Sequence, residues 1–478
     1  MASTRDQVEA YSFAARRQVL ALLHGEELVT VDPRRRLNRS VIAGLLVGVV
    51  ALAAVGVAGF LKGGSSTTVP TEGVIIDSST GGAYVLIDHV LHPALNLASA
   101  KLIAGRQTTT VASSALRSLP RGLPVGIPDA PDSVPQRSQL TRSSWSVCDI
   151  APQASAARPQ VVVSIGTTRP ASVPGGAGVV AQAEDGTTWL LVDGMRYQVD
   201  SDVSTLLGLE RVAPVPVRSE VLDLVPAGTP LAIPTIPGNG EQPSVHLAFD
   251  AVVGDLVRVP STDQRYVVLR DGLAPVNAFT FALLAGGAKA TLSQPASAVV
   301  GGASKTRPQI PVLWPQQALT RLIARPAANE PLCVTYTPGR PNTTAAAWPV
   351  TISEPAKVPL ATHASAVAPA SGSLPTVATG VAVPSGSGVL ARASATGGVD
   401  TTYTLVTDTG IRYSISSADA VGRLGYTTGA AVIVPKPFLS LLPAGPGLDP
   451  TAAAAEYAGA AQAPVATATP SSAATSGS

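Results

Sequence analysis

Two glycine-rich segments of this chain have the residue types that could hold a nucleotide cofactor. Residues 176–181 (GAGVVA) and 386–391 (GSGVLA) both match the G-x-G-x-x-A pattern, which places a pyrophosphate at the N-terminus of a helix. Both segments lead into apolar stretches typical of strands, so we interpret them as entries to β-hairpins. Residues 301–306 (GGASKT) come nearest to a phosphate-binding loop, but they lack the Gly-Lys step of a Walker A motif. We therefore expect no bound cofactor.

Other residues that could perform catalysis or bind a metal are scattered along the chain. The sequence has no G-x-S-x-G, S-x-x-K or H-E-x-x-H motif, which gives no support to a serine hydrolase, a penicillin-binding protein or a zinc protease. His89 and His92 could supply half of a metal site, but no acidic or thiol cluster lies near them, which favours a solvated or packing role. Asp129 and Asp132 flank prolines, where carboxylates suit turns as readily as acid–base catalysis. The sequence predicts neither a catalytic residue nor a metal site.

The element that positions the rest of the chain is an uninterrupted apolar run at residues 41–61. At ~1.5 Å per residue it spans roughly 30 Å, the thickness of a bilayer core, which predicts a single transmembrane helix. Four arginines within residues 33–39 precede the run and one lysine, Lys62, follows it. The positive-inside rule therefore places residues 1–40 in the cytoplasm and the rest outside the cell membrane. The alternative is a cleaved signal peptide, but the run is too long and is followed by a poor cleavage site.

The cytoplasmic segment, residues 1–40, carries one predicted helix. Thr4 and Gln7 have the spacing of a capping box, and the helical pattern ends at His24. Such a helix places an apolar stripe on one face, and the candidate partner-binding residues on it are Val8, Tyr11, Ala15, Val19 and Leu22. A stripe on a lone helix predicts a partner, either the cytoplasmic region of another protein or the membrane surface. Acidic residues near the stripe favour a protein.

The exported region, residues 62–478, has the composition of a β-rich α+β protein. The chain contains 44 glycines and 42 prolines, whereas charged residues make up only 13% of it. These values indicate many short strands and turns, arranged in about two to four domains. The formal net charge of +2 excludes a strong attraction to nucleic acid.

Four copies of one pattern follow each other in the exported region. Each copy has an apolar strand, a turn with an aspartate, a second strand and a short helix, and the first strand begins at Tyr84, Trp189, Tyr266 or Tyr403. The predicted helix N-caps are Asn96, Ser201, Asn277 and Ser416, and the predicted helix ends are Gly105, Gly208, Gly286 and Gly425. With a further strand before the aromatic residue, each copy is a strand-strand-strand-helix repeat. Proline turns at Pro120, Pro226 and Pro443 close three copies, and the third copy lacks this turn.

Two cysteines, Cys148 and Cys333, lie in the exported region, where the redox environment permits a disulfide. The alternative is a pair of buried free thiols. A bridge would join two stretches that bracket repeats two and three, and would make them a central core from which repeats one and four leave at either end. We therefore expect an elongated exported domain with a disulfide-linked core and four small repeat lobes.

The predicted segments, in chain order, are a cytoplasmic segment (1–40), a transmembrane helix (41–61), repeat one (71–125), a first core segment (126–176), repeat two (177–232), repeat three (253–309), a second core segment (310–360), a linker (361–386), repeat four (387–449) and a disordered tail (450–478). The linker and the tail are predicted from their alanine-, serine- and proline-rich composition.

The chain resembles the EccB family, a membrane component of the type VII (ESX) secretion system. The most specific stretches are residues 96–103 (NLASAKLI), 121–132 (RGLPVGIPDAPD), 145–149 (WSVCD) and 331–334 (PLCV). The resemblance implies a single-pass subunit of the inner membrane whose exported domain has a disulfide-bearing core and four repeats. It also implies assembly with an EccC-like motor ATPase and with EccD- and EccE-like membrane subunits. Family members are often labelled ATPases, whereas this sequence has no Walker A motif.

Three functions are therefore compared. The favoured one is a structural subunit of the secretion channel that links the cytoplasmic motor to an exported vestibule and self-associates through its exported domain. The first alternative is an ATP-hydrolysing subunit of the same system, which is disfavoured because most of the folded mass lies outside the cell membrane. The second alternative is a membrane-anchored ectodomain that binds the cell wall.

Overall fold

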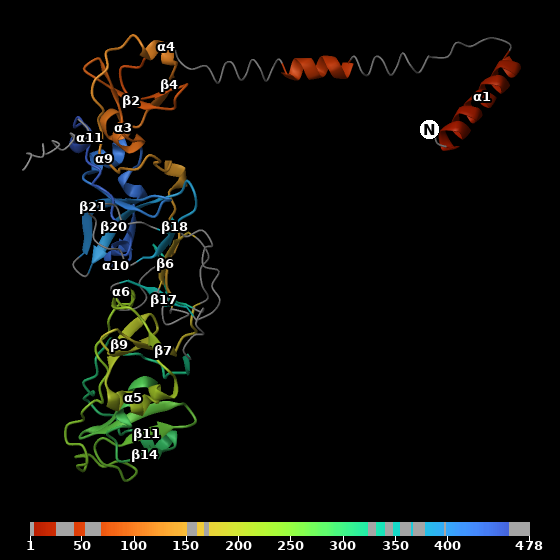
Figure 1. Ribbon diagram of the computed structural model, residues 1–478. Coiled ribbons are helices and arrows are strands. Elements are labelled where there is room, and N and C mark those ends of the chain that lie inside the picture. Colours follow the sequence, from red (N-terminus) through yellow and green to blue (C-terminus); the bar gives the residue numbers. More distant parts are fainter. Residues whose placement is uncertain are drawn as a thin grey trace, which may run out of the picture. The chain divides into compact units, whose positions relative to one another are not determined.

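The computed structural model describes residues 4–24, 43–52, 68–150, 160–166, 172–323, 331–339, 348–353, 365–366, 378–395 and 398–457. The chain divides into two compact units, Met1–Ser66 and Thr67–Ser478. The first unit contains helix α1 and the second contains all the sheets (Figure 1).

In the first unit, helix α1 covers Thr4–His24 and is drawn in red in Figure 1. It ends at His24 as predicted, and Thr4 is its first helical residue instead of the residue before the helix. Residues 43–52 are also helical and lie inside the predicted membrane span at 41–61, the rest of which lies outside the described residues. Within the described ranges, no helix has the length and mean hydropathy needed to cross a bilayer. The membrane span therefore stays a prediction.

The second unit contains four small sheets that share one strand order. In each sheet the first three strands form an antiparallel meander, and a fourth strand pairs in parallel with the first. A parallel pairing needs a crossover connection, and the helix of each repeat supplies it. The four predicted strands that begin at an aromatic residue are all present. The fourth strands of the sheets were not predicted from the sequence. They contain two to four residues, too few to give a periodic signal.

The elements of the four repeats run in the same order. Repeat one has β1 (Val74–Asp77), β2 (Ala83–Ile87), β3 (Val90–Pro93), α3 (Leu97–Ala104) and β4 (Thr108–Val111). Repeat two has β7 (Ala177–Gln182), β8 (Thr188–Val192), β9 (Met195–Val199), α5 (Ser201–Leu207) and β10 (Val215–Pro216). Repeat three has β11 (Leu256–Val259), β12 (Gln264–Leu269), β13 (Gly272–Pro275), α7 (Ala278–Leu284) and β14 (Thr291–Ser293). Repeat four has β20 (Val389–Ala395), β21 (Gly398–Val406), β22 (Arg412–Ile415), α9 (Ala418–Arg423) and β23 (Val432–Pro435).

Two of the predicted helix N-caps are confirmed. The side chains of Asn96 and Asn277 each accept a hydrogen bond from a backbone N–H in the first turn of their helix. Two predicted helix ends are confirmed as well, at Gly105 and Gly208. Gly208 has a φ of 66°, a left-handed conformation that glycine adopts without the steric cost of a Cβ atom.

The other predicted caps are wrong by one residue. Asp200 caps α5 in place of Ser201, and Ser417 caps α9 in place of Ser416. In both pairs either side chain can accept the bond, so the sequence alone does not choose between them. The C-caps of the helices in repeats three and four are Ala285 and Leu424, each one residue before the predicted glycine.

A short helix and a turn close every repeat. The helices are α4 (Ser113–Leu116), α6 (Ser219–Leu222), α8 (Ala296–Val299) and α10 (Lys436–Ser440). After each turn one residue forms a parallel bridge with the third strand, and the bridged pairs are Leu91 with Arg121, Arg196 with Ala227, Leu273 with Ala303 and Arg412 with Ala444. Repeat three therefore closes like the others, although Gly302 stands where they have proline.

A fifth sheet forms the centre of the second unit, with the strand order β17-β16-β5-β6-β19-β18. Its strands are β5 (Trp145–Ile150), β6 (Gln160–Ile165), β16 (Leu332–Tyr336), β17 (Val350–Ile352), β18 (Ser365–Ala366) and β19 (Gly380–Ala382). The last two come from the predicted linker at residues 361–386. The linker prediction is therefore wrong for these residues, because β19 pairs in parallel with β6. One short strand of the second core segment, β15 (Arg321–Ile323), pairs with β7 of repeat two.

The tail prediction is wrong for its first residues. Helix α11 covers Pro450–Ala453, with Asp449 as N-cap and proline in the first turn. Glu456 then forms an antiparallel bridge with Val125 of the segment that follows repeat one. The remainder of the predicted tail, residues 458–478, lies outside the described residues. Three 3₁₀ turns complete the described elements: η1 (Arg137–Gln139), η2 (Leu209–Arg211) and η3 (Thr428–Ala430).

The repeats pack in two pairs. Helix α3 of repeat one contacts α9 and α11, and the buried side chains there include Leu102 and Leu424. Repeats two and three contact each other through α5 and α7, where Phe279 is fully buried. The central sheet shares a hydrophobic cluster with repeats two and four, which includes Trp145. The prediction that repeats one and four leave the core at either end is wrong, because the apolar faces of their helices cover each other.

Candidate functional site

Helix α1 presents the predicted partner-binding stripe. All five stripe residues are exposed, and Tyr11 and Leu22 expose 81% and 87% of their full residue surface. At 100° per residue, Val8, Tyr11, Ala15, Val19 and Leu22 fall within one third of the helix circumference. No described residue covers them. An apolar stripe of this size on a polar helix is typical of a protein-binding surface.

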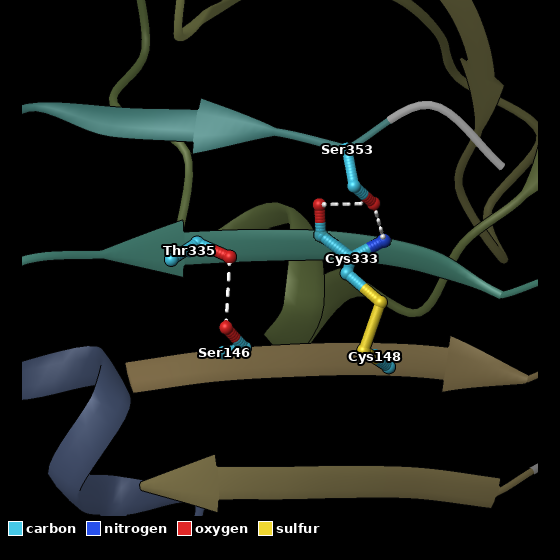
Figure 2. Close-up of a disulfide and its surroundings, with 5 residues drawn as sticks. All are labelled: Ser146, Cys148, Cys333, Thr335 and Ser353. Atoms are coloured by element: carbon cyan, nitrogen blue, oxygen red, sulfur yellow. Dashed lines mark hydrogen bonds between the residues drawn. A yellow bond between two sulfur atoms is a disulfide. The ribbon is translucent and has the colours of Figure 1, made fainter. Parts of the chain in front are cut away.

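The disulfide between Cys148 and Cys333 is formed, and it joins β5 to β16 at the centre of the fifth sheet (Figure 2). The two residues are direct partners in the antiparallel pair, and their Cα atoms are 4.0 Å apart. The backbone N–H of Cys333 donates to Ser353 Oγ at 3.0 Å and its carbonyl accepts from the Ser353 N–H at 2.9 Å. Cys333 therefore faces Cys148 as a non-hydrogen-bonded pair, which brings the two Cα atoms close. The alternative of two free thiols is wrong.

Two polar pairs lie beside this disulfide. Ser146 and Thr335 share a hydrogen bond of 2.9 Å between their hydroxyls, buried between the same two strands (Figure 2). Asp149, the residue after Cys148, accepts a hydrogen bond of 3.1 Å from the backbone N–H of Arg218 in repeat two. The Arg218 guanidinium lies 3.6 Å from the same carboxylate. Burial raises the pKa of Asp149, and the contacts with Arg218 oppose this effect. The pair ties repeat two to the disulfide-bearing strand.

The glycine-rich segments are hairpin entries, as predicted. Residues 176–181 and 386–391 lead into β7 and β20, not into helices. The Gly176 N–H donates to Asp193 Oδ1 at 3.1 Å, and the Gly386 N–H donates to Asp408 Oδ2 at 2.7 Å. In both repeats the aspartate of the turn binds the glycine. These segments do not present a helix N-terminus to a pyrophosphate.

The segment at residues 301–306 has its donor groups occupied by Asp271. The Ser304 hydroxyl donates to Asp271 Oδ1 at 2.5 Å, and the backbone N–H groups of Lys305 and Thr306 donate to Oδ2 at 3.0 and 3.2 Å. These bonds lower the pKa of Asp271 to about 2, with the Ser304 hydroxyl as the largest cause. A carboxylate of the chain itself therefore fills the place that a phosphate would take in a phosphate-binding loop.

The histidines and aspartates considered as catalytic or metal-binding groups lie apart. His92 is buried, and its Nδ1 lies 2.8 Å from the carbonyl oxygen of Leu123. His89 is exposed in the turn between β2 and β3, with a φ of 65°. Asp129 and Asp132 are both exposed in the segment after repeat one. Across the described ranges, no three His, Cys, Asp or Glu side chains are placed to hold a metal ion.

Sequence reasoning missed the residue that joins repeats one and four. Arg423 Nη1 donates to the carbonyl oxygens of Leu102 and Ile103, both at 3.1 Å, and so caps the C-terminus of α3 from another repeat. Asp419, one turn earlier in α9, holds the guanidinium through a bond of 2.7 Å to Nε. The only signal in the sequence is the Asp419–Arg423 spacing, which indicates a pair within one helix. It carries no information about a contact with a distant helix.

Comparisons with known proteins place these features in a family. Residues 1–462 match the protein family described as "Type VII secretion system ESX-1, transport TM domain B". The ESX-3 secretion system ATPase EccB3 of Mycolicibacterium smegmatis is 31% identical, over 93% of this chain and 89% of its own length. The ESX-1 secretion system ATPase EccB1 of Mycobacterium tuberculosis is also 31% identical, over 59% of this chain and 61% of its own length.

Two solved structures have a similar fold. A chain of the intact ESX-5 inner membrane complex matches with a TM-score of 0.64 and 26% identity, over 96% of both chains. The EccB3 dimer from the ESX-3 core complex matches with a TM-score of 0.65 and 27% identity, over 80% of this chain and all of the other.

Proposed function

The chain belongs to the EccB family of type VII (ESX) secretion systems, and from this premise we propose that it is a structural and assembly subunit of an ESX channel in the inner membrane. The match to the family covers α1 and all four repeats. Relatives with a similar fold belong to an ESX-5 inner membrane complex and an ESX-3 core complex. We expect this chain to occupy the corresponding place in its own system.

The proposed role is to link a cytoplasmic motor to the exported region of the channel. Residues 1–40 are cytoplasmic, residues 41–61 cross the membrane once, and the repeats lie outside. The observation that carries this role is the uncovered stripe on α1, which gives a short cytoplasmic segment a surface for a much larger partner. That partner is an EccC-like motor ATPase. EccD- and EccE-like subunits contact the chain in the membrane.

Two features support an exported location for the repeats and their self-association. A buried disulfide between strands of the central sheet is typical of proteins that fold in an oxidising compartment. A relative forms a dimer, the EccB3 dimer of the ESX-3 core complex. We expect the exported domain of this chain to associate with a second copy as well.

The experiment that tests the linking role removes the stripe. In the variant, Tyr11, Val19 and Leu22 are replaced by serine, which removes roughly 1.5 to 3 kcal/mol of apolar burial per residue if each is fully buried at the contact. The matched control replaces Phe13 and Leu20, which are also exposed but lie on the opposite face of α1. Both proteins are purified from membranes in mild detergent.

We expect the stripe variant to insert into the membrane and fold, but to lose the motor during purification. The control variant should retain it. A stripe variant that assembles and secretes as well as the control contradicts the docking role.

An ATP-hydrolysing role is the alternative, because the two relatives named above carry the word ATPase in their names. In this chain the nearest candidate for a phosphate-binding loop already holds Asp271, and its one lysine is Lys305. We therefore expect the purified full chain to show no ATP hydrolysis. Turnover that disappears on Lys305→Ala contradicts the non-enzymatic proposal.

A further inference from the structure

The outer edge of β4 in repeat one has no hydrogen-bonding partner among the described residues. β4 pairs in parallel with β1, where the carbonyls of Gln107 and Val111 accept bonds of 2.8 and 3.0 Å. Successive residues of a strand point their backbone groups to alternate sides. The N–H and C=O groups of Thr108 and Thr110 therefore point away from β1, toward the open edge. Their side chains are exposed.

The equivalent edges of the other repeats are shorter or blocked. β10 contains Pro216 and follows Pro214, so it lacks the donors that a further strand needs. The carbonyl of Ile433 in β23 accepts a bond of 2.9 Å from the Tyr336 hydroxyl, and the strand ends at Pro435. β14 is open, but Pro295 stands two residues after its end. An unblocked edge is a template for another strand.

We propose that β4 pairs in antiparallel fashion with β4 of a second copy of this chain, about a two-fold axis at Thr109. In this register Thr108 of each copy lies opposite Thr110 of the other, and all the outward N–H and C=O groups of these residues find partners. Thr109 lies opposite its own copy as a non-hydrogen-bonded pair. Arg106 lies opposite Ala112, so no like charges face each other. Threonine pairs across strands are favourable.

The occupant of the edge is a second copy because the sequence of β4 is complementary to itself and because of where repeat one lies in the chain. Only residues 62–67 separate the predicted span from Thr68, the first described residue of the second unit. Two copies anchored in one membrane are thus kept together, each with the start of its second unit tied to that membrane by a short stretch of chain. This raises the effective concentration, so that a short ladder suffices for pairing. The proposal rests on the self-association put forward above.

The test is disulfide trapping in membranes that contain the full chain. Thr109→Cys places a third cysteine at the two-fold axis, in the same non-hydrogen-bonded geometry as Cys148 and Cys333. The matched control is Leu292→Cys, the equivalent position of β14. We expect a dimer on non-reducing gels for Thr109→Cys that disappears with reductant, and no such dimer for Leu292→Cys. Equal trapping at both positions, or none at Thr109, overturns the proposal.

A second variant removes the edge donor without touching the sheet. Thr110→Pro deletes an N–H group that points outward, whereas Ser293→Pro makes the same change in β14. Each proline variant is combined with Thr109→Cys. We expect the Thr110→Pro combination to lose the trapped dimer and the Ser293→Pro combination to keep it. If Thr110→Pro leaves the dimer intact, the edge is not the interface. Co-purification of the motor through α1 is measured separately, so failure here leaves the linking role standing.

Discussion

The closing turns of the four repeats differ at the residue that follows the bridge to the third strand. This residue is glycine in repeats one, two and four, and Ser304 in repeat three. In repeats one, two and four a glycine lies against a ring, and the pairs are Gly122 with His92, Gly228 with Tyr197 and Gly445 with Tyr413. A Cβ atom on any of these glycines would lie 2.3 Å from the ring. In repeat three the ring position holds Ala274, and Ser304 takes the place of the glycine. Without a ring, a Cβ atom has room.

The four closing turns share a backbone hydrogen bond and differ in the side-chain contacts that stabilise it. The backbone bond from the glycine to the third strand measures 2.8 Å for Gly445 to Arg412, and the corresponding bond from Ser304 to Leu273 measures 2.9 Å. The backbone is thus the common element. The ring over glycine stabilises the turn in repeats one, two and four, and the Ser304 hydroxyl bound to Asp271 stabilises it in repeat three.

The largest effect is expected for Gly445→Ala. The new Cβ atom would overlap the Tyr413 ring, and overpacking of this kind costs about 1 to 3 kcal/mol in the free energy of unfolding. The control is Gly447→Ala, whose Cβ would meet only Ser414 Oγ at 3.4 Å. Chemical unfolding followed by circular dichroism measures both. Equal stability of the two variants would contradict the ring-over-glycine account.

A smaller effect is expected for alanine at the same backbone position of repeat three. Ser304→Ala keeps the Cβ atom and loses the hydroxyl bond to Asp271, which corresponds to about 0.5 to 1.5 kcal/mol for one hydrogen bond. The same unfolding measurement applies, with wild-type protein as reference. A larger loss of unfolding free energy for Ser304→Ala than for Gly445→Ala would contradict this prediction.

The third prediction concerns pH, because the carboxylate of Asp271 binds the closing turn of repeat three. The pKa of Asp271 is about 2, below its ordinary value of 3.8, so the ionised group stabilises the fold above about pH 4. This contribution is lost as the pH falls from about 4 to about 2. Asp271→Asn should therefore lose less stability than wild type over this window. An equal loss of stability in the two proteins as the pH falls from about 4 to about 2 would contradict the prediction.

The smallest effect is expected where repeats one and four meet. Arg423→Lys keeps the charge but loses the planar guanidinium that reaches two carbonyls of α3, and a C-terminal contact of this kind contributes about 0.3 to 1 kcal/mol. Repeats two and three contact each other through α5 and α7, where an apolar cluster is buried. Salt should therefore weaken the Arg423 contact more than the apolar contact between repeats two and three, which a melting series with and without salt measures. Identical salt dependence of Arg423→Lys and wild type would argue against it.

The sequence predicts the repeats well where the pattern is local. Asn96 and Asn277 are the only cap-forming residues at their helix starts, and both are correct. At Ser201 and Ser416 a second capping side chain stands next to the first, and the choice depends on which backbone is extended. Local chemistry alone leaves that choice open.

Features that depend on contacts between distant residues could not be predicted from the sequence. β4 is a run of three threonines followed by a valine, so its sequence lacks the apolar–polar alternation that identifies a half-buried strand. The closure of repeat three lacks proline, and its bond to Asp271 spans more than 30 residues. The packing of α3 against α9 depends on tertiary structure that neither helix encodes by itself. The stripe on α1 is visible in the sequence because it needs only helical periodicity.

The disulfide also determines which repeats would carry a pulling force applied to the two ends of the second unit. Repeats two and three, from Ala177 to Ser304, lie inside the loop that Cys148 and Cys333 close. A pulling force between the two ends of the second unit travels along repeat one and some strands of the central sheet, and crosses the sulfur–sulfur bond into repeat four. Repeats two and three carry no tension in this arrangement. The load passes through a covalent path that bypasses them.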